Sequence, residues 1–163
     1  MTNQWERFAA ASVALLALPA VAADLEVRLS GAPDGGELVF QVYDAADAFG
    51  DLRDPAQEIR MPARGDGGYA LTGLVAGEIA ILVYYDENGN GVLDKNFIGI
   101  PREPLAISNN YQPKGPPTFA RASFVLEEND APPIDMNIYR VLGDSGRWGL
   151  GLGVITRSSP YVD

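Results

Sequence analysis

The nine residues from Asp86 to Asp94 have the types and spacing of a loop that binds a hard cation. They directly follow an apolar run, residues 79–85, which we interpret as a buried strand. Oxygen-bearing side chains fall at loop positions one, three, five and nine, with a glycine at position six and a main-chain carbonyl at position seven. Ca²⁺ binds about six to eight oxygen ligands, and loops supply them by such alternation around a glycine turn. The predicted metal ligands are Asp86, Asn88, Asn90, the carbonyl of Val92, and Asp94.

The same loop also has the pattern of a turn that needs no metal. EF-hand loops end with a bidentate glutamate at position twelve, where this chain has Phe97. Glu87 or Glu103 could replace that carboxylate only if the fold brings one of them back to the loop. Asn-Gly pairs occur at residues 88–89 and 90–91, and such pairs favour tight turns because both residues tolerate positive φ. A weak Ca²⁺ site and a metal-free turn therefore both remain open.

The charge of the chain excludes several classes of partner. Its formal net charge is -10 and its isoelectric point is about 4.3, and it has no cluster of basic residues. Proteins that bind nucleic acids or anionic lipids use such clusters. We therefore predict no nucleic-acid partner. An acidic surface keeps a protein soluble and also suits divalent cations.

The 163-residue chain contains no Cys and no His. This removes thiol nucleophiles, imidazole bases, Ser-His-Asp triads and the common zinc sites. A glycan hydrolase acting through paired carboxylates remains, with Glu103 and either Asp86 or Asp94 as candidate residues. The chain also lacks a nucleophile motif of the type G-x-S-x-G. We therefore expect a protein without enzymatic activity.

Residues 1–23 have the pattern of a secretory signal peptide. The apolar stretch from Phe8 to Leu18 is too short for a membrane span. Ala22 and Ala23 offer small residues for cleavage before Asp24, with cleavage after Ala22 as the alternative. We therefore predict a periplasmic or secreted protein. A chain without Cys cannot carry a lipoprotein anchor.

From residue 25 onward the hydrophobic pattern is typical of β-strands. Apolar and polar residues alternate over residues 25–30, which predicts a half-buried strand, and apolar residues at 38, 40 and 42 predict the next strand over residues 37–43. The run 78–85 is apolar at nearly every position, which predicts a central strand buried on both faces. Short strands separated by Gly, Pro, Asn and Asp predict a single antiparallel β-sandwich over residues 24–141. Further strands are predicted at residues 69–74, 124–126 and 134–138, and a helical turn within 45–52.

A long segment rich in Pro and Asn follows the acidic loop and reaches residue 119. A loop of this length inside a compact domain is usually functional or disordered. Its prolines restrict the backbone. We predict an ordered loop that packs against the domain through four apolar anchors, namely Phe97, Ile100, Tyr111 and Phe119.

Several blocks of residues, taken in order, resemble the bacterial secreted family called domain of unknown function 2141 (DUF2141). The blocks are residues 84–94 (YYDENGNGVLD), 97–103 (FIGIPRE), 108–109 (SN) and 115–119 (GPPTF). The resemblance covers roughly residues 25–139 and implies an exported β-sandwich of immunoglobulin-like or prealbumin-like type, with no agreed activity. A looser resemblance is to the calcium-binding β-sandwich repeats of Gram-positive adhesins, which carry a D-x-N-x-N-G-x-x-D loop after a strand.

Residues 142–163 form a separate tail in which glycine alternates with bulky apolar residues. One face of such a strand would carry Trp148, Leu150, Leu152 and Val154, as in a transmembrane barrel strand or a strand beside another backbone. The tail resembles the first strand of the outer-membrane scaffold family that interacts with lytic transglycosylases. A remnant of a longer fusion, a partner-docking strand and a poorly ordered end all remain open. Membrane contact is predicted only through this tail.

These patterns predict an exported, non-enzymatic binding or adaptor module of the cell envelope, with an envelope protein or a glycan as its partner. Two alternatives remain, a calcium-stabilised structural domain and a carboxylate-based glycan hydrolase. Weakly bound Ca²⁺ is the only cofactor that the sequence predicts.

Overall fold

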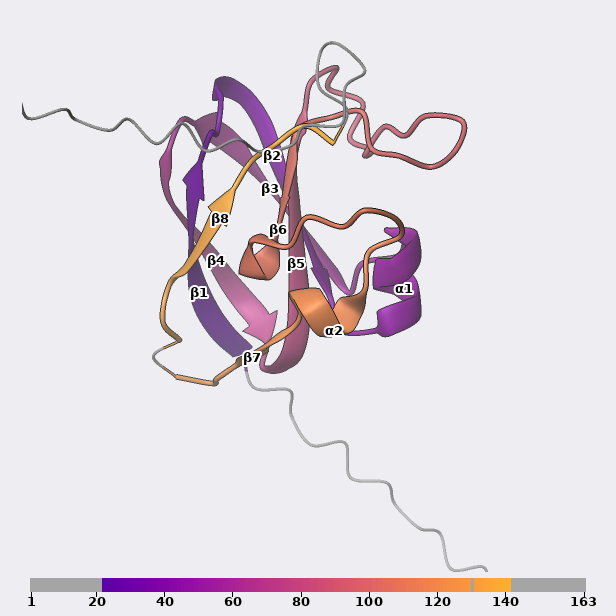
Figure 1. Ribbon diagram of the computed structural model, residues 1–163. Helices are drawn as coiled ribbons and strands as arrows, with labels where there is room; N and C mark the ends of the chain where they lie inside the picture. The colour runs from indigo at the N-terminus through magenta and orange to yellow at the C-terminus, as the bar shows by residue number, and fades with distance from the viewer. Residues whose placement is uncertain (1–21, 130, 142–163) are drawn as a thin grey trace, which may run out of the picture.

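The computed structural model describes residues 22–129 and 131–141, which form two packed β-sheets (Figure 1). The predicted all-β sandwich is confirmed. Residues 1–21 of the predicted signal peptide and the predicted tail, residues 142–163, lie outside the described residues. Within the described part, no helix has the length and hydropathy needed to cross a membrane. The elements are β1 (Ala22–Ser30), β2 (Asp34–Tyr43), α1 (Ala46–Asp51), β3 (Gln57–Arg64), β4 (Gly67–Val75), β5 (Gly77–Asp86), β6 (Leu105–Ile107), the 3₁₀ turn η1 (Ser108–Asn110), α2 (Phe119–Ala122), β7 (Phe124–Leu126) and β8 (Ile134–Asn137).

The two sheets have the strand orders β4-β1-β8 and β3-β2-β5-β6. β7 also pairs with β5, at residues 77–79, while β6 pairs with it at residues 82–84. All these pairs are antiparallel except β1 and β8, which run parallel with Val27 opposite Ile134. Just after β8, the backbones of Leu105 and Tyr139 exchange two hydrogen bonds of 2.9 and 2.8 Å. This exchange joins the β8 segment to β6, so both sheets are connected along that side.

The main hydrophobic core lies between the sheets. Every second side chain of β1 enters it, starting with Ala23, while the intervening side chains are exposed. This alternation follows from the two-residue period of a strand. From the other sheet, Phe40 lies in the core with its ring centroid 5.8 Å from that of Tyr69 on β4. The predicted half-buried strand at residues 25–30 is confirmed, and β1 extends it to Ala22.

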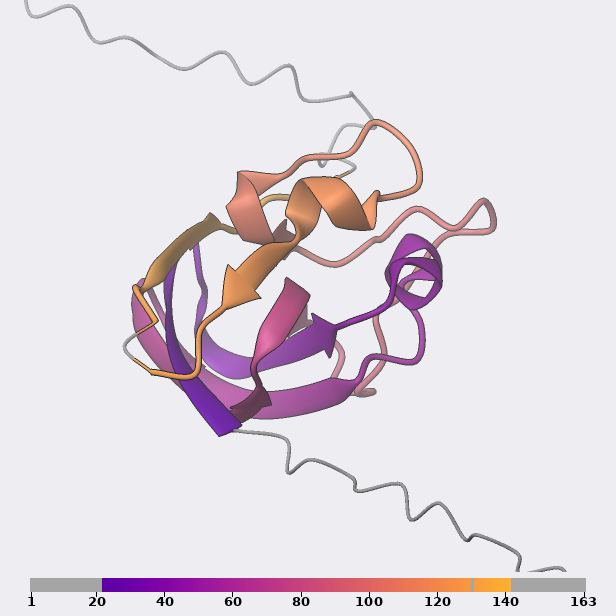
Figure 2. The same ribbon diagram turned by 90° about the horizontal axis from the view of Figure 1, so that it is seen from below.

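A second hydrophobic core covers the opposite face of the β2-β5-β6 sheet. Leu82 and Tyr84 of β5 face this core, whereas their neighbours in sequence face the first one. The cover consists of α1, α2 and the loops beside them, and Figure 2 shows both helices on the same side of this sheet. Phe49 of α1 is fully buried, with ring centroids 5.3 Å from Tyr43 and 6.0 Å from Phe119 in edge-to-face contacts. Because β5 is buried on both faces, its predicted central position is confirmed.

Several features differ from the sequence-based expectations, and among them the short helices η1 and α2 were not predicted. β3 was not predicted, although Ile59, Met61 and Ala63 alternate with Arg60 and Pro62 and pack against the main core; the strand lies at a sheet edge and contains a proline, which weakens a strand prediction. β6 was not predicted, since it has only three residues inside the Pro-rich segment. The prediction of Phe97 as an anchor is wrong, because its side chain is 98% exposed. Tyr111 and Phe119 do pack against the second core, as predicted.

Phe49→Ala is expected to lower the free energy of unfolding by about 3–5 kcal/mol, because it removes a fully buried ring from the second core. Phe97→Ala is the matched control and should change stability by no more than about 0.5 kcal/mol, because that ring is exposed. Urea denaturation followed by circular dichroism measures both variants. Equal effects of the two substitutions would contradict the placement of these rings.

Candidate functional site

Asp86 is the last residue of β5, and its carboxylate fixes the backbone of the predicted cation-binding loop. The residue is only 4% exposed. One carboxylate oxygen accepts hydrogen bonds from the N–H groups of Gly89 at 2.8 Å and Asn90 at 3.2 Å, and the other accepts from Gly91 at 2.7 Å. Gly89 and Gly91 have φ values of 71° and 72°, a conformation that glycine adopts without strain. Three donors on one buried carboxylate fix the turn and compensate its desolvation.

The two asparagines of the loop direct their amide groups toward Asp94. Asn88 Nδ2 donates to Asp94 Oδ2 at 2.7 Å, and Asn90 Nδ2 donates to Asp94 Oδ1 at 3.2 Å. Their side-chain oxygens accept backbone hydrogen bonds two residues on, from Asn90 and from Val92. Three of the four predicted side-chain ligands therefore meet at one carboxylate. A cation at this point would require both amides to turn their oxygens toward Asp94.

Glu103 lies outside this loop in the sequence, but its side chain contacts the loop in the fold. The residue is 2% exposed, and its two carboxylate oxygens accept from the N–H groups of Glu87 and Asp94, each at 3.0 Å. Burial raises the pKa of Glu103, and the two N–H donors partly oppose that rise. The sequence identified Glu103 as a residue that the fold could bring back, and the fold does so. Its carboxylate ties the start of the loop to its end.

These contacts indicate a loop that keeps its shape through its own hydrogen bonds. Arg60 adds one more, from Nη2 to the Gly91 carbonyl at 2.9 Å. Within residues 22–129 and 131–141 no group of three or more Asp, Glu, His or Cys side chains is placed to hold a metal ion. The side chain of Val92 is exposed, on the outside of the turn. The carboxylates of Asp86 and Glu103 are both engaged by backbone donors.

A groove of about 400 Å³ lies beside this loop, over the second core. Its walls come from four parts of the chain, residues 50–52, 95–101, 105–117 and 139–141. Most of the lining side chains are apolar, and four of them are prolines. Proline fixes φ, so the wall is formed before any ligand arrives. The sequence did not predict the groove, although the expected order of its Pro-rich loop was the relevant signal.

Two lysines and one aspartate are the charged residues of the groove wall, namely Lys95, Lys114 and Asp51. Lys95 Nζ donates to the carbonyl oxygens of Asp51 at 2.9 Å and Leu52 at 3.1 Å, at the C-terminal end of α1. Burial lowers the pKa of Lys95, and the positive charge of Arg53 lowers it further. An anion beside Lys95 would oppose both effects.

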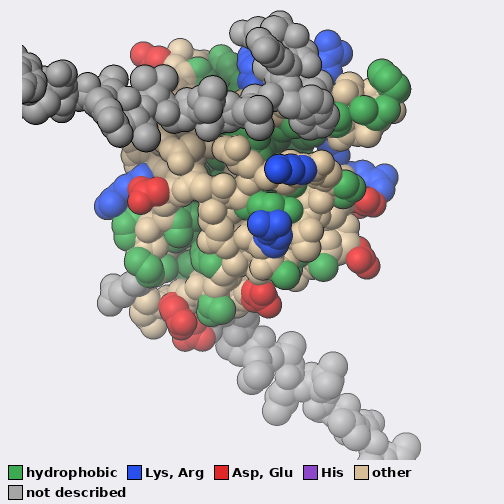
Figure 3. All heavy atoms as spheres, viewed as in Figure 1, with side chains coloured by type: hydrophobic (Ala, Val, Ile, Leu, Met, Phe, Trp, Pro, Cys, Tyr) green, Lys and Arg blue, Asp and Glu red, His purple; other side chains and the backbone are tan. Residues whose placement is uncertain are grey.

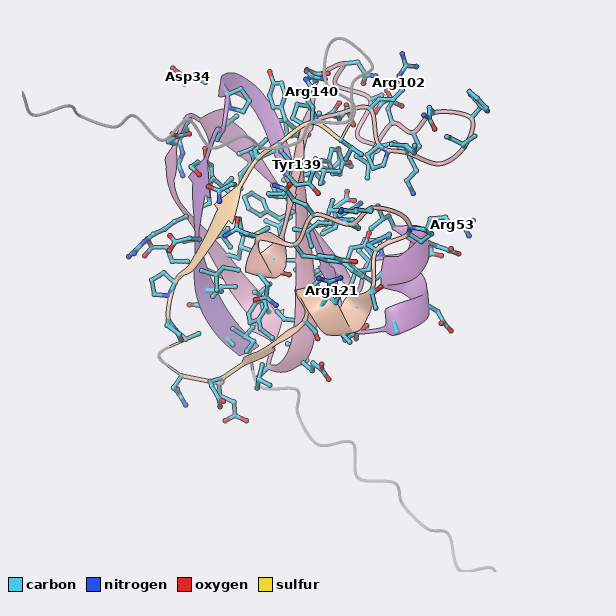
Figure 4. All side chains as sticks on the ribbon, in the orientation of Figure 1. Asp34, Arg53, Arg102, Arg121, Tyr139 and Arg140 are labelled. Atoms are coloured by element: carbon cyan, nitrogen blue, oxygen red, sulfur yellow. The ribbon has the colours of Figure 1, made fainter. Side chains whose placement is uncertain are left out.

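Tyr139 also lines the groove, and Figure 4 shows it in the middle of this face. Its hydroxyl is buried and has no hydrogen-bond partner among the described residues, and Tyr84 of the second core shares this property. Burial raises the pKa of Tyr139 to about 12, with a smaller effect from Tyr111. The phenol therefore stays protonated at neutral pH. The Tyr139 hydroxyl adds one buried polar group to a groove whose lining is mostly apolar.

The stability of the protein is expected to depend on pH through Glu103. Because burial raises the pKa of this carboxyl, the folded state binds its proton at a higher pH than the unfolded chain does. Its contribution to stability is therefore fully present below the ordinary pKa of glutamate and is lost as pH rises through the folded-state pKa. The free energy of unfolding of the wild type, minus that of Glu103→Gln, should fall as pH rises from about 4 to 7.

Chemical denaturation at several pH values, with a chelator present throughout, measures this difference. Glu128→Gln replaces an exposed glutamate and serves as the control for the loss of one carboxylate. If the free energy of unfolding of the wild type, minus that of Glu103→Gln, increases with pH, the raised pKa of Glu103 in the folded state is contradicted.

Comparison with known proteins bears on the identity of the chain. A family model described as "Uncharacterized protein conserved in bacteria (DUF2141)" matches residues 27–132. No curated protein and no solved structure matches the chain. The matched range spans most of the sandwich, from β1 to the segment before β8, and includes the Asp86–Asp94 loop and most of the groove. The chain therefore belongs to the DUF2141 family of bacterial proteins.

Proposed function

We propose that this protein is an exported, non-enzymatic binding module of the cell envelope, and that the groove over the second core is its ligand site. The groove itself supports the proposal most strongly. Its volume of about 400 Å³ falls within the range of small-molecule sites, roughly 300–1,000 Å³. Its walls are mostly apolar with a few polar groups, as in such sites.

The hydrogen bonds made by the loop carboxylates support the proposal that the protein has no enzymatic activity. Asp86 and Glu103, the two buried members of the proposed hydrolase pairs, accept five backbone hydrogen bonds between them. A carboxylate acting as acid or nucleophile must face its substrate. In this arrangement both carboxylates face the main chain of the loop and hold it in place.

Export is supported by the pattern of residues 1–23. Ala23 is 2% exposed and lies in the main core, so cleavage after Ala22 would keep this contact in the mature chain. Cell fractionation followed by intact-mass measurement tests the location and the cleavage point together. Recovery of the uncleaved chain from the cytoplasm would contradict export.

The binding proposal predicts that the protein retains a small molecule from envelope extract through the groove. Ile98 lines the groove and Phe97, its neighbour, does not. Both side chains are exposed, at 64% and 98%, so replacing either should leave the fold intact. Ile98→Asp is expected to lose the retained molecule and Phe97→Asp to keep it.

Native mass spectrometry of the protein after incubation with envelope extract provides the readout for all three chains. Retention by the wild type and Phe97→Asp alone supports the groove as the site. Retention that is the same for all three chains, or absent from all, would refute it.

A calcium-stabilised structural domain is the second candidate. Its support is that the side chains of Asn88, Asn90 and Asp94 lie within hydrogen-bond distance at one point, where a bound cation would turn both amide oxygens inward. With two loop carboxylates, Asp86 and Asp94, the expected dissociation constant is on the order of 10⁻⁴–10⁻³ M. At 10 mM Ca²⁺ such binding would stabilise the fold by about 1–3 kcal/mol.

The melting temperature is therefore expected to be higher in 10 mM Ca²⁺ than in chelator, by about 3–8 °C. Asp94→Asn should abolish the gain, whereas Asp135→Asn, which changes an exposed carboxylate on β8, should retain it. Differential scanning calorimetry measures all three chains in both buffers. Superimposable curves for the wild type would exclude this candidate.

A further inference from the structure

We infer that the ligand of the groove is a small amphipathic anion, with one acidic group at the lysine side and an apolar body along the proline-lined wall. This inference rests on the proposed function, since it names the chemical class that the proposed site would take. Three observations support it, namely the charge of the groove wall, the distribution of basic side chains around it, and its size.

The charge of the wall is opposite in sign to that of the chain. Two lysines and one aspartate line the groove, a net of one positive charge, whereas the whole chain carries -10. Lys114 lies on the exposed Pro-rich loop and makes no ion pair within the described part of the chain. Lys95 is partly buried, and its ammonium group lies beside the C-terminal end of α1. A ligand anion would gain from both lysines, and a ligand cation would be repelled by them.

Basic side chains also surround the groove. Of the nine Lys and Arg residues within the described part of the chain, two line the groove and three directly adjoin a lining residue in sequence, namely Arg53, Arg102 and Arg140. Figure 4 shows these three arginines and Arg121 around Tyr139. In Figure 3 Lys or Arg side chains lie in the middle of the same face, and the acidic side chains lie toward its edges.

Some of these cations already have partners inside the protein. Arg53 pairs with Asp51 and Arg140 pairs with Glu87. Their contribution to ligand binding is therefore a positive field at the rim, since their charges are already shared. Lys114 remains the cation best placed to contact a ligand directly, and for this reason it is the residue changed in the test.

The size of the groove favours a small molecule over a protein segment. Specific protein–protein interfaces bury about 800 Å² on each partner, which far exceeds the walls of a 400 Å³ groove. The apolar wall offers no row of polar groups for a sugar ring, whose hydroxyls would each need a partner. An alkyl or aromatic body needs no such partners and would gain from burial against the prolines and Ile98 and Ile100.

The test uses isothermal titration calorimetry of the full chain with three probes that share one alkyl body. Dodecanoate carries a negative charge, dodecanol carries none, and dodecyltrimethylammonium carries a positive charge, and all are kept below the concentration at which they aggregate. Dodecanoate is expected to bind at least about tenfold more tightly than either other probe. Its affinity should fall as salt is added, because charge contributes to binding.

Two charge reversals provide the matched variants. Lys114→Glu places a negative charge at the groove, and Arg28→Glu makes the same change of net charge on the exposed face of β1. Lys114→Glu should weaken dodecanoate binding about tenfold, and Arg28→Glu less than about twofold. Ile98→Asp should abolish binding, and Phe97→Asp should leave it unchanged.

The outcomes separate this inference from the proposed function. Equal affinity for the three probes, or equal losses in Lys114→Glu and Arg28→Glu, would overturn the anionic class. If no probe binds while the wild type and Phe97→Asp still retain a molecule from envelope extract, the inference fails and the proposed function stands. If neither binding nor retention is observed, both fail together.

Discussion

Burial of β5 on both faces positions the loop and the groove. Successive side chains of a strand point in opposite directions, so an apolar residue at nearly every position requires a cover on each side. Ile81 and Val83 are covered by the sheet that contains β1, and Leu82 and Tyr84 are covered by the two helices and the Pro-rich segment. The groove lies among the segments of this second cover. The acidic loop begins where β5 ends, at Asp86.

The loop illustrates how buried charge can serve the fold. Two carboxylates with 2–4% exposure would be costly if left alone, because burial disfavours the charged form. Asp86 and Glu103 are instead surrounded by backbone N–H groups that would themselves lack partners inside a tight turn. Each group therefore compensates the desolvation of the other. The acidic character of the loop, which suggests a cation, also has this internal use.

Rigid walls and positive charge set the groove apart from the rest of the surface. Proline-rich loops lose little conformational freedom when a ligand binds, since their backbone angles are already restricted. Of the nine basic residues in the described part of the chain, two line the groove and three adjoin a lining residue in sequence. Charge at the rim affects which ligands approach, whereas the apolar wall provides most of the burial. The two properties together favour a ligand that combines an acidic group with an apolar body.

The sequence by itself determined the local features of this protein. The alternation in residues 25–30, the apolar run of β5 and the Asn-Gly turns act between near neighbours, and each leaves a pattern that can be read. The edge strand β3 also alternates, at Ile59, Met61 and Ala63, but Pro62 interrupts its polar positions and makes the pattern less typical of a strand.

Only the tertiary structure decided the features that join distant segments. It brought Glu103 back to Glu87 and Asp94, it turned Phe97 outward, and it built the groove from residues near 51, 98, 115 and 140. The physical reason is that hydrogen bonds to buried carboxylates and the apolar area buried in the second core together select the packing of these segments. That area depends on residues far apart in the chain, and no short stretch of sequence contains it.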